Sequence, residues 1–155
     1  MPTTTPARAP KPIEVLLVED NPADVRLTQE ALRDSSPNVH LNVARDGVEA
    51  LEFLHHQGQF DNAPVPDLIV LDLNLPRKNG REVLSEVKAD PDLHKIPVLV
   101  MTTSRAEQDV QKAYALNANC YITKPMDLDE FLRIVKAIEE FWLHTATLPT
   151  ISAAA

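Results

Sequence analysis

The sequence is poor in cysteine, in positive charge and in long hydrophobic runs. Its single cysteine, Cys120, excludes an intrachain disulfide and fits a reducing compartment. No apolar run approaches the length of a membrane span, and the N-terminus lacks the apolar core of a signal peptide. Only 15 Lys and Arg stand against 23 Asp and Glu, so the formal net charge is −8, which argues against nucleic acid and anionic membranes as partners. We therefore expect a cytoplasmic protein.

The length of 155 residues, with 44% hydrophobic and 25% charged residues, is typical of one globular domain with a single sizeable core. Residues 1–12 are rich in Pro and Thr without apolar periodicity, which predicts a disordered leader. Residues 13–143 carry the regular patterns and form the expected domain. Residues 144–155 have no pattern, and we expect a flexible tail there.

Five short apolar stretches alternate with segments of helical spacing. The runs at Ile13–Val18, Asp67–Leu71 and Ile96–Met101 are typical of strands buried on both faces of a parallel sheet. Val39–Val43 alternates with polar residues, as a less buried strand does, and Cys120–Ile122 is a short fifth strand. This order predicts an α/β protein in which a five-stranded parallel sheet is doubly wound, with helices on both faces.

Polar side chains follow the predicted strands at the point where each strand ends. They are Glu19 and Asp20, Asp72, Thr102 and Thr103, and Lys124. Because the carboxyl ends of parallel strands meet at one edge of a sheet, we expect these groups to line one cleft.

The chemistry of this set favours phosphate and a hard cation. Carboxylates without histidine or cysteine suit Mg²⁺, which keeps several waters and accepts phosphate oxygens. A bound cation masks the charge of Asp72, so that its oxygen can attack a phosphoryl group. Lys124 can pair with Asp72 and then with a phosphoryl oxygen, while Thr102 can donate a hydrogen bond to the same group.

Four stretches together resemble the receiver domain of two-component response regulators. They are VEDNP at 18–22, LDLNLP at 71–76 with Gly80 after it, Thr102, and YITKP at 121–125. The resemblance covers Ile13 to Trp142 and implies the (βα)5 flavodoxin-like receiver fold. It implies a signalling protein rather than an enzyme, with self-phosphotransfer and slow autodephosphorylation as its only chemistry.

The resemblance also implies a role for each matching residue. Asp72 would be the phosphoacceptor, with Glu19 and Asp20 as the acidic pair. Asp20, Asp72 and the backbone carbonyl of Asn74 would hold Mg²⁺, and Glu19 would contribute through a water. The remaining roles would fall to Thr102 as the switch hydroxyl, Thr103 beside it, Tyr121 as the rotating aromatic, and Lys124 before a cis Pro125.

Four less specific segments of the sequence are similar to those of the small response regulators that work with bacterial, notably cyanobacterial, phytochrome histidine kinases. They are DNPAD at 20–24, the long connection after the second predicted helix, NCYITKP at 119–125 and EEFWL at 139–143. A phytochrome-type sensor kinase is the partner that this resemblance implies. Thr103 departs from the small residue that many receivers carry there, and we expect it to alter access to the pocket or the phosphoryl lifetime. The resemblance implies the same kind of effect for Asn74 and Ser104 at neighbouring positions.

Simpler interpretations stand beside these. Asp72 alone would be a loop or helix cap, Thr102–Ser104 an ordinary polar turn, and Tyr121 a half-buried sheet aromatic.

The functional alternatives are a Mg²⁺-dependent aspartyl-phosphate phosphohydrolase, a phosphate sink or relay without its own output, and a nucleotide-binding flavodoxin-like module. The last would need a glycine-rich loop after the first strand, where Glu19 to Pro22 instead repel phosphate.

The last predicted helix has an unusually wide apolar face. Ile134, Ile138 and Phe141 lie three or four residues apart and broaden the stripe that packs on the sheet. An exposed remainder of this kind is a candidate contact surface. We therefore expect a symmetric homodimer through the fourth helix, the fifth strand and the fifth helix.

Overall fold

The computed structural model describes residues 12–33 and 38–151. In chain order the elements are β1 (Ile13–Val18), α1 (Pro22–Arg33), β2 (Val39–Ala44), α2 (Gly47–Leu54), the 3₁₀-helix η1 (Gly58–Phe60), β3 (Leu68–Leu71), α3 (Gly80–Ala89), β4 (Val98–Thr102), α4 (Glu107–Ala115), β5 (Cys120–Thr123), α5 (Leu128–Ile138) and the π-helix η2 (Glu139–Thr145). Among the described residues, no helix combines the length and apolar character that crossing a membrane requires.

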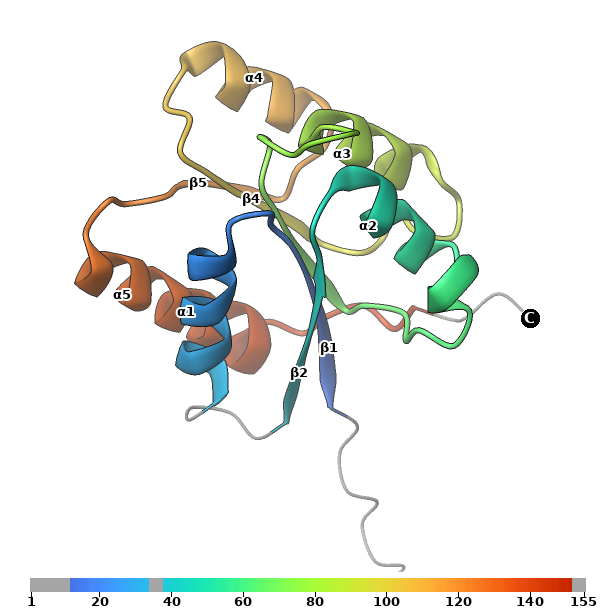
Figure 1. Ribbon diagram of the computed structural model, residues 1–155, viewed down its shortest axis with the longest axis horizontal. Helices are drawn as coiled ribbons and strands as arrows, with labels where there is room; N and C mark the ends of the chain where they lie inside the picture. Colours follow the sequence, from blue (N-terminus) through green and yellow to red (C-terminus); the bar gives the residue numbers. More distant parts are fainter. Residues whose placement is uncertain (1–11, 34–37, 152–155) are drawn as a thin grey trace, which may run out of the picture.

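The strands form one parallel sheet in the order β2-β1-β3-β4-β5, which confirms the predicted fold class. Figure 1 shows α1 and α5 on one face of this sheet and α2, α3 and α4 on the other. The register pairs Val18 with Leu71 and Leu71 with Val100, so β1 and β3 end at the same level and β4 continues beyond them to Thr102. The cleft residues follow directly from these ends.

Two cores lie on the two faces because side chains alternate along each strand. In β3, Leu68 and Val70 pack with α1 and α5, whereas Ile69 and Leu71 pack with α2, α3 and α4. The same alternation separates the residues of β1 and β4. All four residues of β3 are buried, as a continuous apolar run predicts for a central parallel strand.

Side-chain caps begin α1 and α5 at the cleft edge. Asn21 Oδ1 accepts from the amides of Ala23 and Asp24, and Pro22 occupies the first helical position. The side chain of Asp127 likewise accepts from the amide of Glu130 at the start of α5. These caps fix where the loops after β1 and β5 end.

The expected domain bounds remain predictions, although part of the expected tail can be located. Residues 139–145 form a π-helical turn after α5, and the half-buried Ile151 packs against the core beneath α2 and α3. Residues 1–11 of the expected leader and 152–155 of the expected tail lie outside the described residues.

Candidate functional site

Asp72 follows β3 and is 7% exposed, at the edge of the sheet where the strands end. Its backbone amide donates to the carbonyl of Val18 in the neighbouring strand, which fixes the start of the loop. Gly80 lies against the other side, because a Cβ there would come within 2.2 Å of the Asp72 carbonyl oxygen. The loop is therefore closely packed, and Asp72 is held between β1 and the start of α3.

Lys124 brings its ammonium into the same cleft from the end of β5, with its side chain 7% exposed. Its Nζ lies 3.1 Å from Oδ2 of Asp72 and 3.0 Å from Oδ2 of Asp24, and it also donates to Oε2 of Glu19. The structure thus brings Lys124 and Asp72 together, as predicted, although they stand 52 positions apart. Each of the three N–H donors of Lys124 therefore has a carboxylate acceptor. This pairing allows the ammonium to be buried, because an unpaired buried charge would carry a large desolvation cost.

Glu19, Asp20 and Asp72 form an oxygen-lined cluster beside Lys124. One carboxylate oxygen from each lies within 4.8 Å of the others, with Glu19 and Asp72 buried and Asp20 exposed. Among the described residues, this is the one group of three or more His, Cys, Asp or Glu side chains with such spacing. Hard oxygen donors that are partly open to solvent fit a divalent cation that keeps waters. The predicted metal ligands therefore converge, as far as their side chains are concerned.

Burial and pairing shift the protonation of the two central groups. Burial raises the pKa of Glu19 from 4.5 to about 7, with Asp72 acting in the same direction and Lys124 opposing them. Burial alone would lower the pKa of Lys124, but the carboxylates of Glu19, Asp72 and Asp24 outweigh it and hold that pKa above its ordinary value. Lys124 is therefore a permanent cation in this cleft.

The last residue of β4, Thr102, and the loop after it carry the predicted hydroxyl groups. Thr102 is buried completely, and its Oγ1 accepts from Nδ2 of Asn74 at 3.4 Å, while Thr103 is exposed. The amide of Asn74 donates to Oδ1 of Asp72 at 3.0 Å. Thr102 and Asp72 are thus linked through Asn74, and Thr103 lies on the solvent side.

Tyr121 is tied to this loop rather than to Asp72. Its hydroxyl donates to the carbonyl of Ser104 at 3.0 Å. The Ser104 hydroxyl in turn donates to Asp109 of α4, and Asp109 forms an ion pair of 3.3 Å with Arg81 of α3. Arg81 and Asp109 were not identified from the sequence, because surface charges on two separate helices carry no sign of their contact.

The predicted cis bond before Pro125 is wrong. The Lys124–Pro125 peptide bond is trans, as is every other peptide bond among the described residues. The trans form is the lower-energy isomer for X–Pro bonds. The backbone amide of Lys124 donates to the carbonyl of Thr102 at 2.7 Å, so the chain enters the cleft as a continuation of β5.

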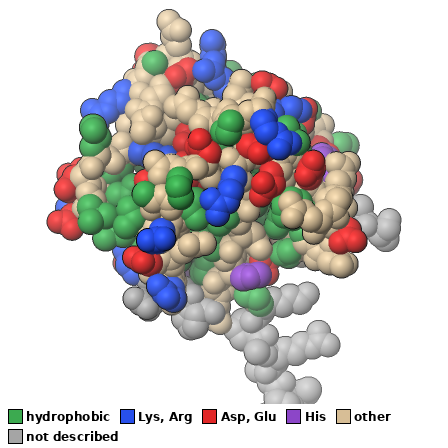
Figure 2. All heavy atoms as spheres, in the orientation of Figure 1, with side chains coloured by type: hydrophobic (Ala, Val, Ile, Leu, Met, Phe, Trp, Pro, Cys, Tyr) green, Lys and Arg blue, Asp and Glu red, His purple; other side chains and the backbone are tan. Residues whose placement is uncertain are grey.

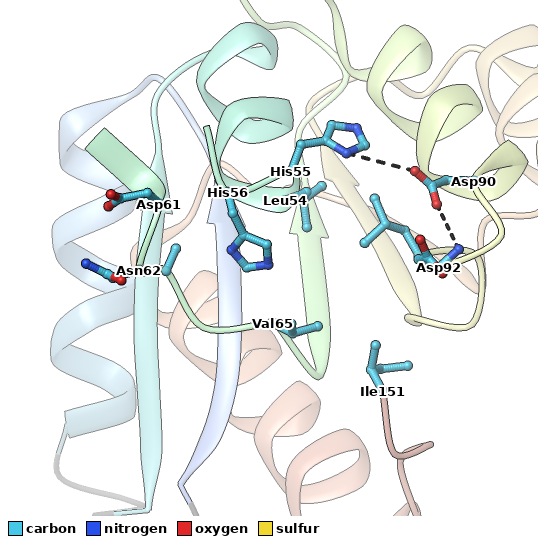
Figure 3. A pocket seen from close by; sticks show the side chains of 11 residues that line it. Leu54, His55, His56, Asp61, Asn62, Val65, Asp90, Asp92 and Ile151 are labelled. Carbon is cyan, nitrogen blue, oxygen red and sulfur yellow. Dashed lines mark hydrogen bonds and ion pairs between the residues drawn. The ribbon is translucent and has the colours of Figure 1, made fainter. Parts of the chain in front are cut away.

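A separate pocket of about 360 Å³ opens on the far side of the molecule from the cleft, and the adjacent histidines His55 and His56 line it. Figure 3 shows His55 turned toward Asp90 and Ile151 closing the lower side. The separation of His55 Nδ1 from Asp90 Oδ2 is 3.9 Å, a long ion-pair distance between partly exposed groups. The sequence assigns these histidines no function, and the geometry adds none.

Comparison with known proteins gives consistent matches over most of the chain. A family model described as the response regulator receiver domain matches residues 15–136. The response regulator Rcp1 of Synechocystis is 53% identical over 138 residues, which span 89% of this chain and 94% of Rcp1. The crystal structure of Mn²⁺-bound Rcp1 has a TM-score of 0.87 at 52% identity and covers 90% of this chain and 100% of that one. The crystal structure of the phosphorylated cyanobacterial phytochrome response regulator RcpA has a TM-score of 0.87 at 54% identity, with coverage of 90% and 99%.

Proposed function

Because this chain belongs to the response regulator receiver domain family, we propose that Asp72 accepts a phosphoryl group from a sensor histidine kinase. A receiver domain is a signalling protein, and the acyl phosphate on Asp72 is the proposed signal. The observation that carries this proposal is the contact of buried Asp72 with Lys124 beside the oxygen cluster of Glu19 and Asp20.

In the proposed transfer, an oxygen of Asp72 attacks the phosphorus of the phosphorylated kinase histidine. The new O–P bond forms as the N–P bond breaks, and the imidazole leaves with the electron pair. Mg²⁺, held by Asp20, Asp72 and the Asn74 carbonyl, with Glu19 acting through a water, would supply charge neutralisation for this step. Attack of water on the acyl phosphate then returns Asp72 and inorganic phosphate, which is the slow autodephosphorylation that we expect.

The remaining cleft residues have proposed roles in reading the phosphoryl group. Lys124 shifts one N–H from Asp72 Oδ2 to a phosphoryl oxygen, since the two acceptors are adjacent. The hydroxyl of Thr102 donates to another phosphoryl oxygen, which draws the loop after β4 inward. The side chain of Tyr121 moves with this loop, because its hydroxyl donates a hydrogen bond to the Ser104 carbonyl there. The exposed Thr103 sets access from solvent.

Asn74 argues against turnover as a phosphohydrolase. Its position, two residues after Asp72, holds a neutral amide rather than a second acid that would act as acid and base. We therefore expect negligible turnover of small phosphate esters. A role as a phosphate sink or relay uses the same cleft and is distinguished by whether phosphorylation changes protein contacts.

A phytochrome-type sensor kinase is the proposed donor. RcpA is described as a cyanobacterial phytochrome response regulator, and it shares 54% identity with this chain over nearly its full length. The structure of a bacteriophytochrome response regulator, AtBRR, is 41% identical in sequence to this chain, with a TM-score of 0.69.

The cytoplasmic location inferred from composition stays a prediction.

We also propose a homodimer through α4, β5 and α5. Ile134, Ile138 and Phe141 line an apolar groove with Ile122 and Trp142, and Phe141 is 54% exposed. Figure 2 shows hydrophobic side chains gathered over α5. Phe141→Asp is expected to shift the protein to monomer in sedimentation velocity runs, whereas Gln59→Asp, at an exposed position of η1 outside α4, β5 and α5, is not. A wild-type protein that is monomeric with and without phosphorylation would exclude the dimer.

The decisive experiment for the function is intact-protein mass spectrometry after incubation with acetyl phosphate and Mg²⁺. Wild-type protein should gain one phosphoryl group, and neither Asp72→Asn nor a sample with EDTA should gain it. Asp61→Asn serves as the matched control, because this exposed acid lies outside the cleft. Phosphorylated phytochrome kinase is then used as donor. A wild type that gains no phosphoryl group from either donor, or a gain that persists in Asp72→Asn, contradicts the proposal.

A further inference from the structure

Asp24 is a third carboxylate partner of Lys124. It lies in the first turn of α1, and its Oδ2 is 3.0 Å from Lys124 Nζ, a contact that spans 100 positions of sequence. The side chain is 23% exposed, so it sits at the mouth of the cleft rather than in its floor. From the sequence alone Asp24 is only an acid in the first turn of a helix, where it interacts favourably with the helix dipole.

The partners of the ammonium and the members of the oxygen cluster overlap only in part. Lys124 donates to Glu19, Asp24 and Asp72, whereas the cluster that fits a cation consists of Glu19, Asp20 and Asp72. Glu19 and Asp72 are therefore shared between the ammonium and the cation. Asp24 is the one carboxylate partner that Lys124 does not share with that cluster.

This difference matters when a divalent cation enters. The cation is attracted to the carboxylates of Glu19 and Asp72 and neutralises part of their negative charge. These carboxylates then stabilise the neighbouring ammonium less, and the cation also repels it. The contact with Asp24 is unaffected by this competition, because Asp24 lies outside the oxygen cluster. It offers Lys124 a negative charge that remains available in both states.

We propose that Asp24 is a positioning residue that retains Lys124 in the cleft and thereby allows the cation and the ammonium to occupy it together. The inference rests on the proposed function, because it concerns the same metal-dependent cleft. Without the Asp24 carboxylate, Lys124 depends on the two carboxylates that the cation also needs, and cation affinity falls.

The test measures cation binding directly rather than phosphorylation. Free Mn²⁺ is followed by electron paramagnetic resonance during titration, and Mg²⁺ is then added as a competitor. Asp24→Asn is expected to weaken Mn²⁺ binding about three- to tenfold at low salt. Glu30→Gln removes the same charge from an exposed position on α1 without a contact to Lys124, and serves as the matched control. Asp24→Glu keeps the charge and is expected to restore binding.

A background that lacks the ammonium separates positioning from a general charge effect. In Lys124→Met, adding Asp24→Asn should weaken Mn²⁺ binding no more than Glu30→Gln does. An equal loss in both backgrounds, or wild-type affinity in Asp24→Asn, overturns the proposal. Circular dichroism verifies that each variant is folded, since the loss of a first-turn acid alone would lower helix stability without this coupling.

The outcomes also separate this inference from the proposed function. If wild-type protein binds Mn²⁺ and Asp20→Asn abolishes binding, the cleft is the metal site, whatever Asp24 does. If wild-type protein binds no Mn²⁺ in the cleft, the metal-dependent function and the inference both fail.

Discussion

The hydroxyl of Tyr121 donates a hydrogen bond of 3.0 Å to the backbone carbonyl of Ser104, which lies two residues after the buried Thr102. Through this bond β5 holds the loop that the proposed phosphoryl group displaces. The Ser104 hydroxyl donates to Asp109, and Asp109 in turn pairs with Arg81. A shift of this loop therefore changes contacts of α3, α4 and β5 together.

Removal of the Tyr121 hydroxyl should loosen this connection without destroying the cleft. Tyr121→Phe is expected to lower the free energy of unfolding by about 1 kcal/mol, because it leaves the part-buried Ser104 carbonyl without this donor. Urea denaturation measures this loss. Tyr114→Phe removes the hydroxyl that accepts a 3.2 Å hydrogen bond from the Tyr121 amide, and it should cost less because that contact is exposed and water can replace it. Phosphorylation of Asp72 should persist in both variants, and equal losses of stability would contradict the assignment.

The close approach of Gly80 to Asp72 predicts a large effect from one methyl group. Gly80→Ala places a Cβ 2.2 Å from the Asp72 carbonyl oxygen and 2.6 Å from the Leu73 Cα, both backbone atoms. We expect a loss of more than about 2 kcal/mol in unfolding free energy, together with slower phosphorylation.

The control for Gly80 is Gly58→Ala. Gly58 has a φ of 58° but nothing within 4 Å of an added Cβ. That variant should therefore lose only about 1 kcal/mol, the cost of a left-handed conformation. Similar losses in the two variants would show that the packing around the Asp72 loop is not limiting.

The raised pKa of Glu19 predicts how stability changes with pH in metal-free protein. Because burial raises this pKa from 4.5 to about 7, the folded state takes up a proton more readily than the unfolded state. The resulting stabilisation is full below pH 4.5 and is lost as pH rises through about 7. Glu19→Gln cannot titrate at this position and lacks the effect.

Urea denaturation in EDTA measures this difference. Between about pH 5 and pH 8, the unfolding free energy of wild-type protein should fall by about 2 to 3 kcal/mol relative to Glu19→Gln. Glu30→Gln, at an exposed site, should run parallel to wild type. A constant difference across this range would show that Glu19 titrates normally.

Ile151 tests whether residues near the C-terminal end contribute to the fold. Its side chain is half-buried and packs against the core beneath α2 and α3. Ile151→Ala should lower the unfolding free energy by about 1 kcal/mol through lost apolar burial. The adjacent exposed Thr150→Ala should leave it unchanged. If neither variant matters, the expectation of a flexible tail from residue 144 is favoured.

The parallel sheet and the converging cleft residues could be predicted because both depend on local patterns. A continuous apolar run marks β3, and the polar residue after it must lie at the shared edge. The family assignment followed from the same residues and is confirmed.

The features that the sequence did not reveal depend on contacts between distant segments. Asp24 has the pattern of an ordinary helix-start acid, and its contact with Lys124 arises only from the packing of α1 beside the end of β5.

Backbone and burial details were also beyond the sequence patterns. The cis bond expected before Pro125 came from the family resemblance, and the structure has the trans form there. Glu139 is 4% exposed although its residue type is typical of surfaces, and it contacts His144 within the π-helical turn. The helical spacing of the last segment predicted a helix but not this change of hydrogen-bonding pattern after Ile138.

The span of the Lys124 contacts has a consequence for synthesis of the chain. Its ammonium meets Glu19 across 105 positions, Asp24 across 100 and Asp72 across 52. A nascent chain that has emerged only as far as β4 therefore lacks the cation that pairs with Asp72. The proposed phosphoacceptor cleft is therefore complete only once β5 has docked at the edge of the sheet.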